Sequence, residues 1–81
     1  MKSFGSRELI KCVEKLGFEY KRQSSSHLIY HPPRGSKSMT ISKNILPIQI
    51  GRKTYDKNAQ SRYVSQIKSF GFTKEEIEKN L

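Results

Sequence analysis

The first apolar stripe of the chain has the spacing of an amphipathic helix. Its members recur every three or four residues and are Leu9, Ile10, Val13 and Leu16. This spacing predicts a helix over residues 6–16, in which Ser6 serves as the N-cap and Glu8 lies in the first turn. Gly17 is a typical helix stop, and Phe18 beyond it is placed to fold back on the last turn.

After this helix the pattern changes to the alternation of β-strands. Residues 18–23 alternate apolar and polar side chains, and residues 26–31 form a second candidate strand. In that strand one face carries Leu28 and Tyr30, and the other carries His27, Ile29 and His31. Residues 32–36 have the composition of a turn, and residues 38–42 read as a third strand. Strands so close in sequence favour an antiparallel meander.

The second half of the chain predicts two more helices. Residues 43–55 are apolar in part but are interrupted by Pro47, which indicates an irregular segment or a short edge strand. Asp56 is placed to cap a helix over residues 57–70, whose apolar stripe consists of Ala59, Tyr63, Val64, Ile67 and Phe70. A capping-box spacing at Thr73 then predicts a short helix that runs to about residue 80.

This order of elements predicts one α+β domain over residues 1–81. It contains a three-stranded antiparallel sheet with helices packed on one face and a short C-terminal helix, so the other face of the sheet stays open. Apolar residues make up only 33% of the 81 residues, which is a thin core for a chain of this size. Such a core argues against a large pocket for an organic cofactor.

The charge of the chain is concentrated on its middle part. Lys and Arg number 16 and Asp and Glu 7, which gives a net charge of +9. Between residues 20 and 68 only Asp56 opposes the basic side chains, which are Lys21, Arg22, Arg34, Lys37, Lys43, Arg52, Lys53, Lys57, Arg62 and Lys68. Such a stretch is the electrostatic footprint of a polyanion binder. Charge alone leaves two partners open, a nucleic acid or a protein with acidic patches.

Composition also bears on the compartment in which the protein works. No apolar run approaches the length of about 18 residues that a membrane span needs. The charged N-terminal stretch does not have the pattern of a secretion signal. The lone Cys12 can form neither an internal disulfide nor a Cys-rich zinc site. We therefore expect a protein of the reducing cytoplasm that does not interact with membranes.

Two histidines are the candidates for chemistry. His27 and His31 are four residues apart in one predicted strand, so they share the face opposite Leu28 and Tyr30. A strand histidine is most often an ordinary surface residue, but the basic surroundings here favour a role on phosphates. Imidazole exchanges protons near neutral pH, and Lys or Arg stabilises charge that grows on a phosphate.

Other kinds of site are disfavoured by the residues present. Two histidines without a clustered carboxylate or cysteine supply too few ligands for a metal. Neither a phosphate-binding P-loop nor a dinucleotide-binding glycine motif occurs. Ser25 and Ser26 precede His27, but no acidic residue in the strands is placed to orient the ring as in a catalytic triad.

Several motifs, taken in order, resemble one bacterial family. They are Ser6-Arg7-Glu8-Leu9-Ile10-Lys11, Lys15-Leu16-Gly17-Phe18, Arg22-Gln23-Ser24-Ser25-Ser26-His27, His31-Pro32, and Ile67-Lys68-Ser69-Phe70-Gly71-Phe72 followed by Thr73-Lys74-Glu75-Glu76. No single motif is specific, but together their order and spacing resemble the HicA toxins of toxin–antitoxin pairs. The resemblance covers nearly the whole chain.

The resemblance implies a fold, an activity and a partner. The fold would be similar to a double-stranded-RNA-binding domain, with the order α-β-β-β-α. The protein would be a metal-independent endoribonuclease that cleaves mRNA without a cofactor. Its partner would be an antitoxin of the HicB family. By direct match to the family's Gly-Ser-His motif, the resemblance implies that His27 would be the catalytic histidine and Ser26 the serine before it. The family's glycine is replaced by Ser25, which is strained if this position needs a positive φ.

Three hypotheses about function follow from these observations. In the leading one, RNA lies across the open sheet face, His27 acts as general acid or base, and the phosphates are contacted by Lys21, Arg22, Ser26, Lys37 and Lys43. In the second, the same basic face binds RNA by shape without cutting it. In the third, the chain is a protein-binding domain whose docking surface is the apolar stretch 45–50.

Overall fold

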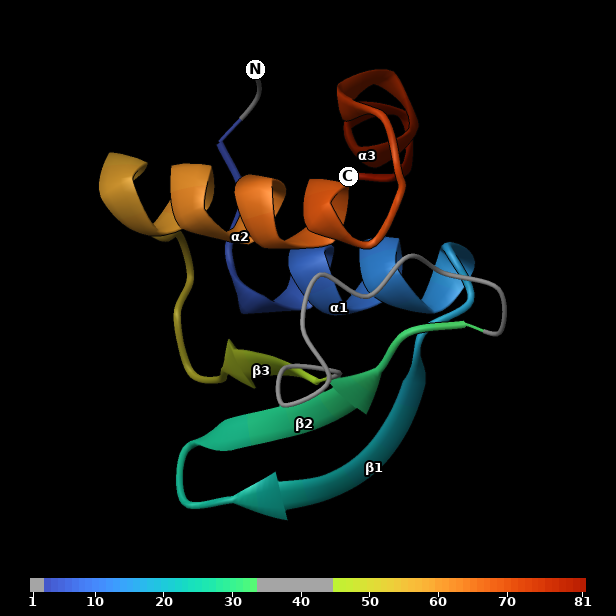
Figure 1. Ribbon diagram of the computed structural model, residues 1–81. Coiled ribbons are helices and arrows are strands. Elements are labelled where there is room, and N and C mark those ends of the chain that lie inside the picture. Colours follow the sequence, from blue (N-terminus) through green and yellow to red (C-terminus); the bar gives the residue numbers. More distant parts are fainter. Residues whose placement is uncertain (1–2, 34–44) are drawn as a thin grey trace.

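The computed structural model describes residues 3–33 and 45–81 as an α+β fold with a single sheet. The elements are α1 (Ser6–Lys15), β1 (Glu19–Ser24), β2 (His27–His31), β3 (Leu46–Gln49), α2 (Lys57–Ser69) and α3 (Lys74–Asn80). The strands pair antiparallel in the order β1-β2-β3, and the three helices lie on one side of the sheet (Figure 1). The predicted order α-β-β-β-α with a short C-terminal helix is confirmed. None of the helices in the described ranges has the length and apolarity needed to cross a membrane.

The third strand of the sheet is formed by the segment that contains Pro47. The sequence placed a strand at residues 38–42, which lie outside the described residues, and gave 43–55 as irregular or a short edge strand. The edge-strand alternative is confirmed, because Leu46–Gln49 pairs with β2 at the end of the sheet. Leu46 and Ile48 are fully buried and supply the apolar side of this strand.

Pro47 is compatible with this strand because its nitrogen points away from β2. The backbone N–H of Gln49 donates to the Tyr63 hydroxyl of α2, at 3.0 Å, on the side of β3 that no strand covers. Backbone groups two residues apart point to the same side of a strand, so the nitrogen of Pro47 also faces this uncovered edge. Proline therefore costs the sheet no hydrogen bond here.

A β-bulge in β1 decides which of its side chains share a face. The register between β1 and β2 shifts between Tyr20 and Arg22, so Lys21 is the extra residue. Tyr20 pairs with Tyr30 and the two rings contact edge to face at 5.8 Å, whereas Arg22 pairs with Ile29. The bulge thus places Arg22 on the open face of the sheet, opposite the helices.

The core lies between the sheet and the helices. As predicted, Tyr30 belongs to the core and Leu28 packs against it, while Ile29 is also buried (6% exposed) but is not part of this cluster. Cys12 lies at the centre of the core, and burial raises the pKa of its thiol to about 11. A thiol with this pKa stays protonated at neutral pH and is a poor nucleophile. The stripe predicted for α2 is buried along Tyr63, Val64, Ile67 and Phe70, with Ala59 half-buried.

The cap of α1 differs from the predicted one. Gly5, not Ser6, is the N-cap, and its backbone N–H donates to the Glu8 carboxylate at 2.8 Å. Ser6 is buried within the first turn, where its hydroxyl donates to the carbonyl of Gln49 (2.8 Å) and accepts from the backbone N–H of Arg52 (3.0 Å). The serine is not available as a cap because its hydroxyl joins α1 to the segment that follows β3.

At Gly5 the backbone of α1's first turn lies directly against the backbone of residues 52–53, next to the hydrogen bonds of Ser6. A Cβ at this position would overlap the carbonyl groups of Lys53 and Arg52, the latter at 2.6 Å. The Ser6 N–H donates to the Arg52 carbonyl at 2.8 Å, and the Tyr55 N–H donates to the Phe4 carbonyl at 2.9 Å. The N-cap of α1 must therefore be glycine because of the close approach, not because of its φ, which is −121°.

Substitution of Gly5 tests this close approach. We expect Gly5→Ala to lower the free energy of unfolding by about 1–3 kcal/mol, since the new methyl group displaces the 52–53 backbone. Urea denaturation of wild type and variant measures the difference. Ser65→Ala, at an exposed position of α2, is the control and should stay within about 0.5 kcal/mol of wild type. Equal stability of Gly5→Ala and wild type would contradict the contact.

Candidate functional site

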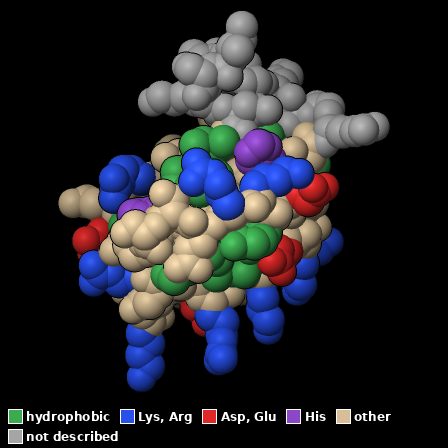
Figure 2. All heavy atoms as spheres, turned by 90° about the horizontal axis from the view of Figure 1, so that it is seen from below, with side chains coloured by type: hydrophobic (Ala, Val, Ile, Leu, Met, Phe, Trp, Pro, Cys, Tyr) green, Lys and Arg blue, Asp and Glu red, His purple; other side chains and the backbone are tan. Residues whose placement is uncertain are grey.

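The open face of the sheet is defined by the strand register. Directly paired residues point to the same side, so this face carries Glu19, Arg22 and Ser24 of β1, His27, Ile29 and His31 of β2, and Pro47 and Gln49 of β3. Lys and Arg side chains surround this region, and the two histidines appear at separate places (Figure 2). Both histidines are half-buried, as expected for side chains on a face that the helices do not cover.

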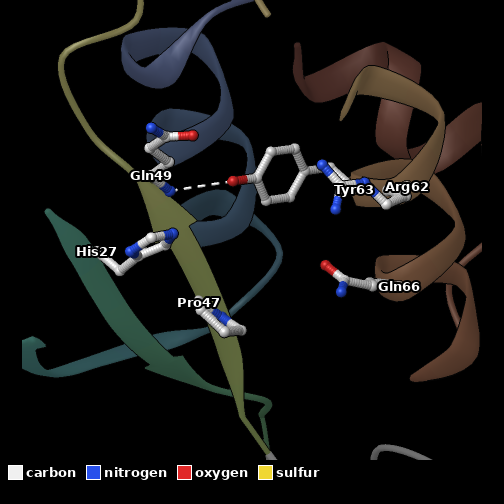
Figure 3. Close-up of a pocket in the computed structure, with 6 residues that line it drawn as sticks. All are labelled: His27, Pro47, Gln49, Arg62, Tyr63 and Gln66. Atoms are coloured by element: carbon white, nitrogen blue, oxygen red, sulfur yellow. Dashed lines mark hydrogen bonds between the residues drawn. The ribbon is translucent and has the colours of Figure 1, made fainter. Parts of the chain in front are cut away.

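His27 lies in a hollow between the sheet and α2. The hollow has a volume of about 180 Å³ and is lined by His27, Pro47, Gln49, Arg62, Tyr63 and Gln66. Strands β2 and β3 supply one wall, and α2, which runs beside the uncovered edge of β3, supplies the other (Figure 3). The imidazole therefore faces a small polar cavity that Arg62 also lines.

The polar side chains of this hollow are not engaged with one another. Within the part of the chain that the structure describes, the side chains of His27, Arg62 and Gln66 have no hydrogen bond or ion pair. Polar groups that are gathered in a concave site without partners are available to a ligand. Among residues 3–33 and 45–81 no group of three or more His, Cys, Asp or Glu side chains is placed to hold a metal ion.

Tyr63 fixes the relative position of the two walls. Its hydroxyl accepts the N–H of Gln49 from β3, and its ring packs against that of Tyr55 with centroids 4.8 Å apart. Burial, as the largest cause, raises the pKa of Tyr55 to about 12, so that its hydroxyl stays protonated and donates to the Gln49 carbonyl at 2.5 Å. Both backbone polar groups of Gln49 are thus held by tyrosine hydroxyls, one from α2 and one from the segment that precedes it.

His31 lies apart from His27 on the same strand. Four residues of extended chain separate the two by roughly 13 Å, which is too far for both to act on one phosphate. His31 lines a shallower hollow of about 440 Å³ together with Gly17, Glu19, Lys21, Pro32 and Pro33. The structure therefore brings the two histidines onto one face but not into one site.

The predicted RNA-binding residues differ in how they are placed. Arg22 is exposed and is the diagonal cross-strand neighbour of His27 on the open face, typically about 7–8 Å away. Lys21, the bulged residue, forms an ion pair with Glu19 at 2.7 Å. Ser26 is an exposed turn residue whose carbonyl accepts the N–H of Ile50. The remaining two, Lys37 and Lys43, lie outside the described residues.

Arg62 and Gln66 are additional site residues that the sequence analysis did not assign. In the sequence, Arg62 is one member of the basic stretch, and no motif marks Gln66. Their spacing of four residues places both on one flank of α2, next to the buried stripe, and this signal is visible in the sequence. That the flank borders β3 and faces His27 follows only from the packing of α2 beside the sheet.

The turn that delivers His27 holds a serine in a left-handed conformation. Ser24 pairs with His27, so Ser25 and Ser26 form a two-residue hairpin loop. Ser25 has φ of +57°, which is the region that glycine occupies most readily. The strain expected where the family motif has glycine is therefore present in this chain.

The comparison with known families identifies the class of protein. The family model described as the HicA toxin of bacterial toxin–antitoxin systems matches residues 6–53. This is more than half of the chain, and the protein therefore belongs to the HicA toxin family. Members of this family are the toxins of such pairs and are generally ribonucleases that cleave mRNA. Membership of the family therefore implies an antitoxin partner. No curated protein and no solved structure matched the chain in the corresponding searches.

Replacement of Ser25 tests the strain in the turn. We expect Ser25→Gly to raise the free energy of unfolding by up to about 1 kcal/mol, because relief of the left-handed strain exceeds the entropy cost of glycine. Thermal unfolding measures the change. Ser26→Gly is the matched control, since Ser26 has no positive φ and gains nothing from glycine. A loss of stability in Ser25→Gly as large as that in Ser26→Gly would contradict this account.

Proposed function

We propose that this toxin is an endoribonuclease that cleaves mRNA with His27 as general acid or base. The observation that carries the proposal is the position of His27, whose imidazole has no partner among the described residues, faces a polar hollow beside Arg62 and shares the open face with Arg22. The RNA lies across this open face. The cations around this face contact phosphates of the RNA. The hollow beside His27 receives the phosphate at which the RNA is cut.

The chemistry needs only the RNA and one proton-transfer group. The 2′-oxygen of a ribose attacks the adjacent phosphorus, the bond from phosphorus to the 5′-oxygen breaks, and a 2′,3′-cyclic phosphate forms. His27 as base takes the proton of the 2′-hydroxyl, while the leaving 5′-oxygen takes a proton from water, and the hydroxide so formed takes the proton back from the imidazolium. As acid, the imidazolium gives its proton to the leaving oxygen and water accepts that of the 2′-hydroxyl. The negative charge that grows on the phosphate is stabilised by nearby guanidinium groups.

The proposed partner is an antitoxin of the HicB kind that covers the same face. A protein that blocks a basic RNA-binding surface competes best when it presents acidic groups to it. Arg22 and Arg62 offer such groups two cations without partners among the described residues. The domain assigned to residues 1–81 would thus have one face for two competing ligands, RNA and antitoxin.

Substitution of His27 tests the catalytic role. We expect His27→Ala to reduce the rate of RNA cleavage by about 10²–10⁴-fold and to abolish growth arrest on induced expression. The melting temperature should change little, because His27 is only half-buried and makes no side-chain hydrogen bond within the described ranges. His31→Ala is the matched control on the same strand and face, and it should retain most of the activity.

The same variants separate catalysis from binding alone. RNA affinity of His27→Ala should stay close to wild type, as measured by fluorescence anisotropy with a transcript of mixed sequence. Unchanged cleavage and toxicity in His27→Ala would exclude the catalytic role. Wild-type protein that binds RNA but does not degrade it would favour the non-catalytic RNA-binding module instead.

The salt dependence of RNA binding tests the role of Arg22. We expect Arg22→Ala to lower the slope of log affinity against log salt by about 0.7, the value for one lost phosphate contact on single-stranded RNA. Lys21→Ala should change the slope less, because Glu19 already pairs with this ammonium group. An equal or larger change for Lys21→Ala would contradict the placement of Arg22 at the RNA.

A further inference from the structure

The geometry points to Arg62 of α2 as the residue that holds the scissile phosphate against His27, a role that rests on the proposed function. Arg62 and His27 line the same hollow from opposite walls, one from the helix and the other from the sheet (Figure 3). Two groups so placed can contact one phosphate from two sides. The helix that follows the sheet therefore completes the site that the strands begin.

The charge balance of the hollow favours an anion. Among the described residues that line it, Arg62 is the one with a permanent charge, and none of them is a carboxylate. The nearest acidic residue along the helix, Asp56, lines an adjacent hollow with Arg62, but its carboxylate accepts the N–H of Ala59 as the N-cap of α2. No ion pair to Arg62 exists among the described residues, so its charge is not neutralised within them.

The size of the hollow fits one phosphate and part of its sugar. A volume of about 180 Å³ is several times the roughly 10–15 Å³ that one water molecule needs, which leaves room for a phosphate group. A longer piece of RNA must therefore lie across the open face, with a single phosphate group entering the hollow. Gln66 and Gln49 also line it and supply amide groups for the oxygens next to that phosphate.

The packing of α2 sets where the guanidinium can reach. Tyr63, the residue after Arg62, is locked by the hydrogen bond from Gln49 and by its ring contact with Tyr55. The backbone position of Arg62 is thus fixed, although its side chain is exposed. A planar guanidinium can donate two hydrogen bonds to a phosphate at once, which an ammonium group does less well.

Cleavage kinetics of α2 variants test this inference. The probe is a single-stranded RNA transcript of mixed sequence, and a 2′-O-methyl version of it, which cannot be cleaved by the 2′-oxygen, reports affinity. We expect Arg62→Ala to lower kcat by about 10²–10³-fold, the effect of removing one donor to the transition-state charge. Arg62→Lys should recover part of this loss. Affinity for the uncleavable RNA should fall far less than kcat.

Two further variants serve as controls for charge and folding. Lys68→Ala removes another exposed cation from the same helix, but one that does not line the hollow, and should cleave at nearly the wild-type rate. Arg62→Met keeps the length and helix propensity of the side chain and should be as inactive as Arg62→Ala. Both Arg62 variants should melt at the wild-type temperature, because the residue is exposed.

The outcomes distinguish this inference from the proposed function. If Arg62→Ala and Arg62→Met cleave like wild type while His27→Ala is inactive, Arg62 has no such role and the proposed function stands. Equal losses in Lys68→Ala and Arg62→Ala would also overturn it, because general attraction would then explain both. If His27→Ala cleaves like wild type, the proposed function and the inference fall together.

Discussion

The hydrogen bonds around the Ser6 hydroxyl are the constraint on which the arrangement of this fold depends. This one oxygen donates to the Gln49 carbonyl at the end of β3 and accepts from the Arg52 N–H in the segment that leads to α2. Gly5 beside it allows the two backbones to touch. The start of the first helix is thereby joined to the end of the last strand, and the hydroxyl of Tyr55 contributes a further bond to the same carbonyl. A buried polar cluster of this kind is stable because every group in it is paired.

This joint explains how so small a protein forms a defined polar hollow. β3 is an edge strand of four residues, and without support its uncovered side would be free to shift. Ser6 and Tyr55 hold Gln49 by its carbonyl, and Tyr63 holds it by its N–H. The strand is therefore fixed between α1 and α2, and the side chains that flank it on the open face keep a constant position relative to His27. The apolar core stabilises the fold, and the polar contacts around Gln49 fix the position of β3 relative to α1 and α2.

The sequence predicted the local features of the fold better than the non-local ones. The helix caps at Asp56 and Thr73 were predicted because their signals lie within four residues, and the face of β2 was predicted from its alternation. The prediction that Ser6 is the N-cap of α1 was wrong, because its hydroxyl forms hydrogen bonds with residues more than forty positions away in the sequence. The strand at Leu46–Gln49 was only one of two alternatives, because proline usually interrupts a strand. Pro47 is tolerated there because its nitrogen faces the edge of β3 that no strand covers, and this is a non-local feature. Arg62 was missed at the site for the same reason: the border between α2 and β3 has no local signal.

The spread of the hollow along the chain has a consequence for the order of events during synthesis. Its walls come from His27 and from Gln66, and the joint at Ser6 closes only with Arg52. Such contacts carry the entropy cost of closing long loops, and they cannot form before the later segment has left the ribosome. A nascent chain that has released only α1, β1 and β2 therefore has the histidine but neither the opposite wall nor the support of the edge strand. For a toxin made by the machinery whose messages its family generally degrades, the hollow is assembled only after α2 has left the ribosome.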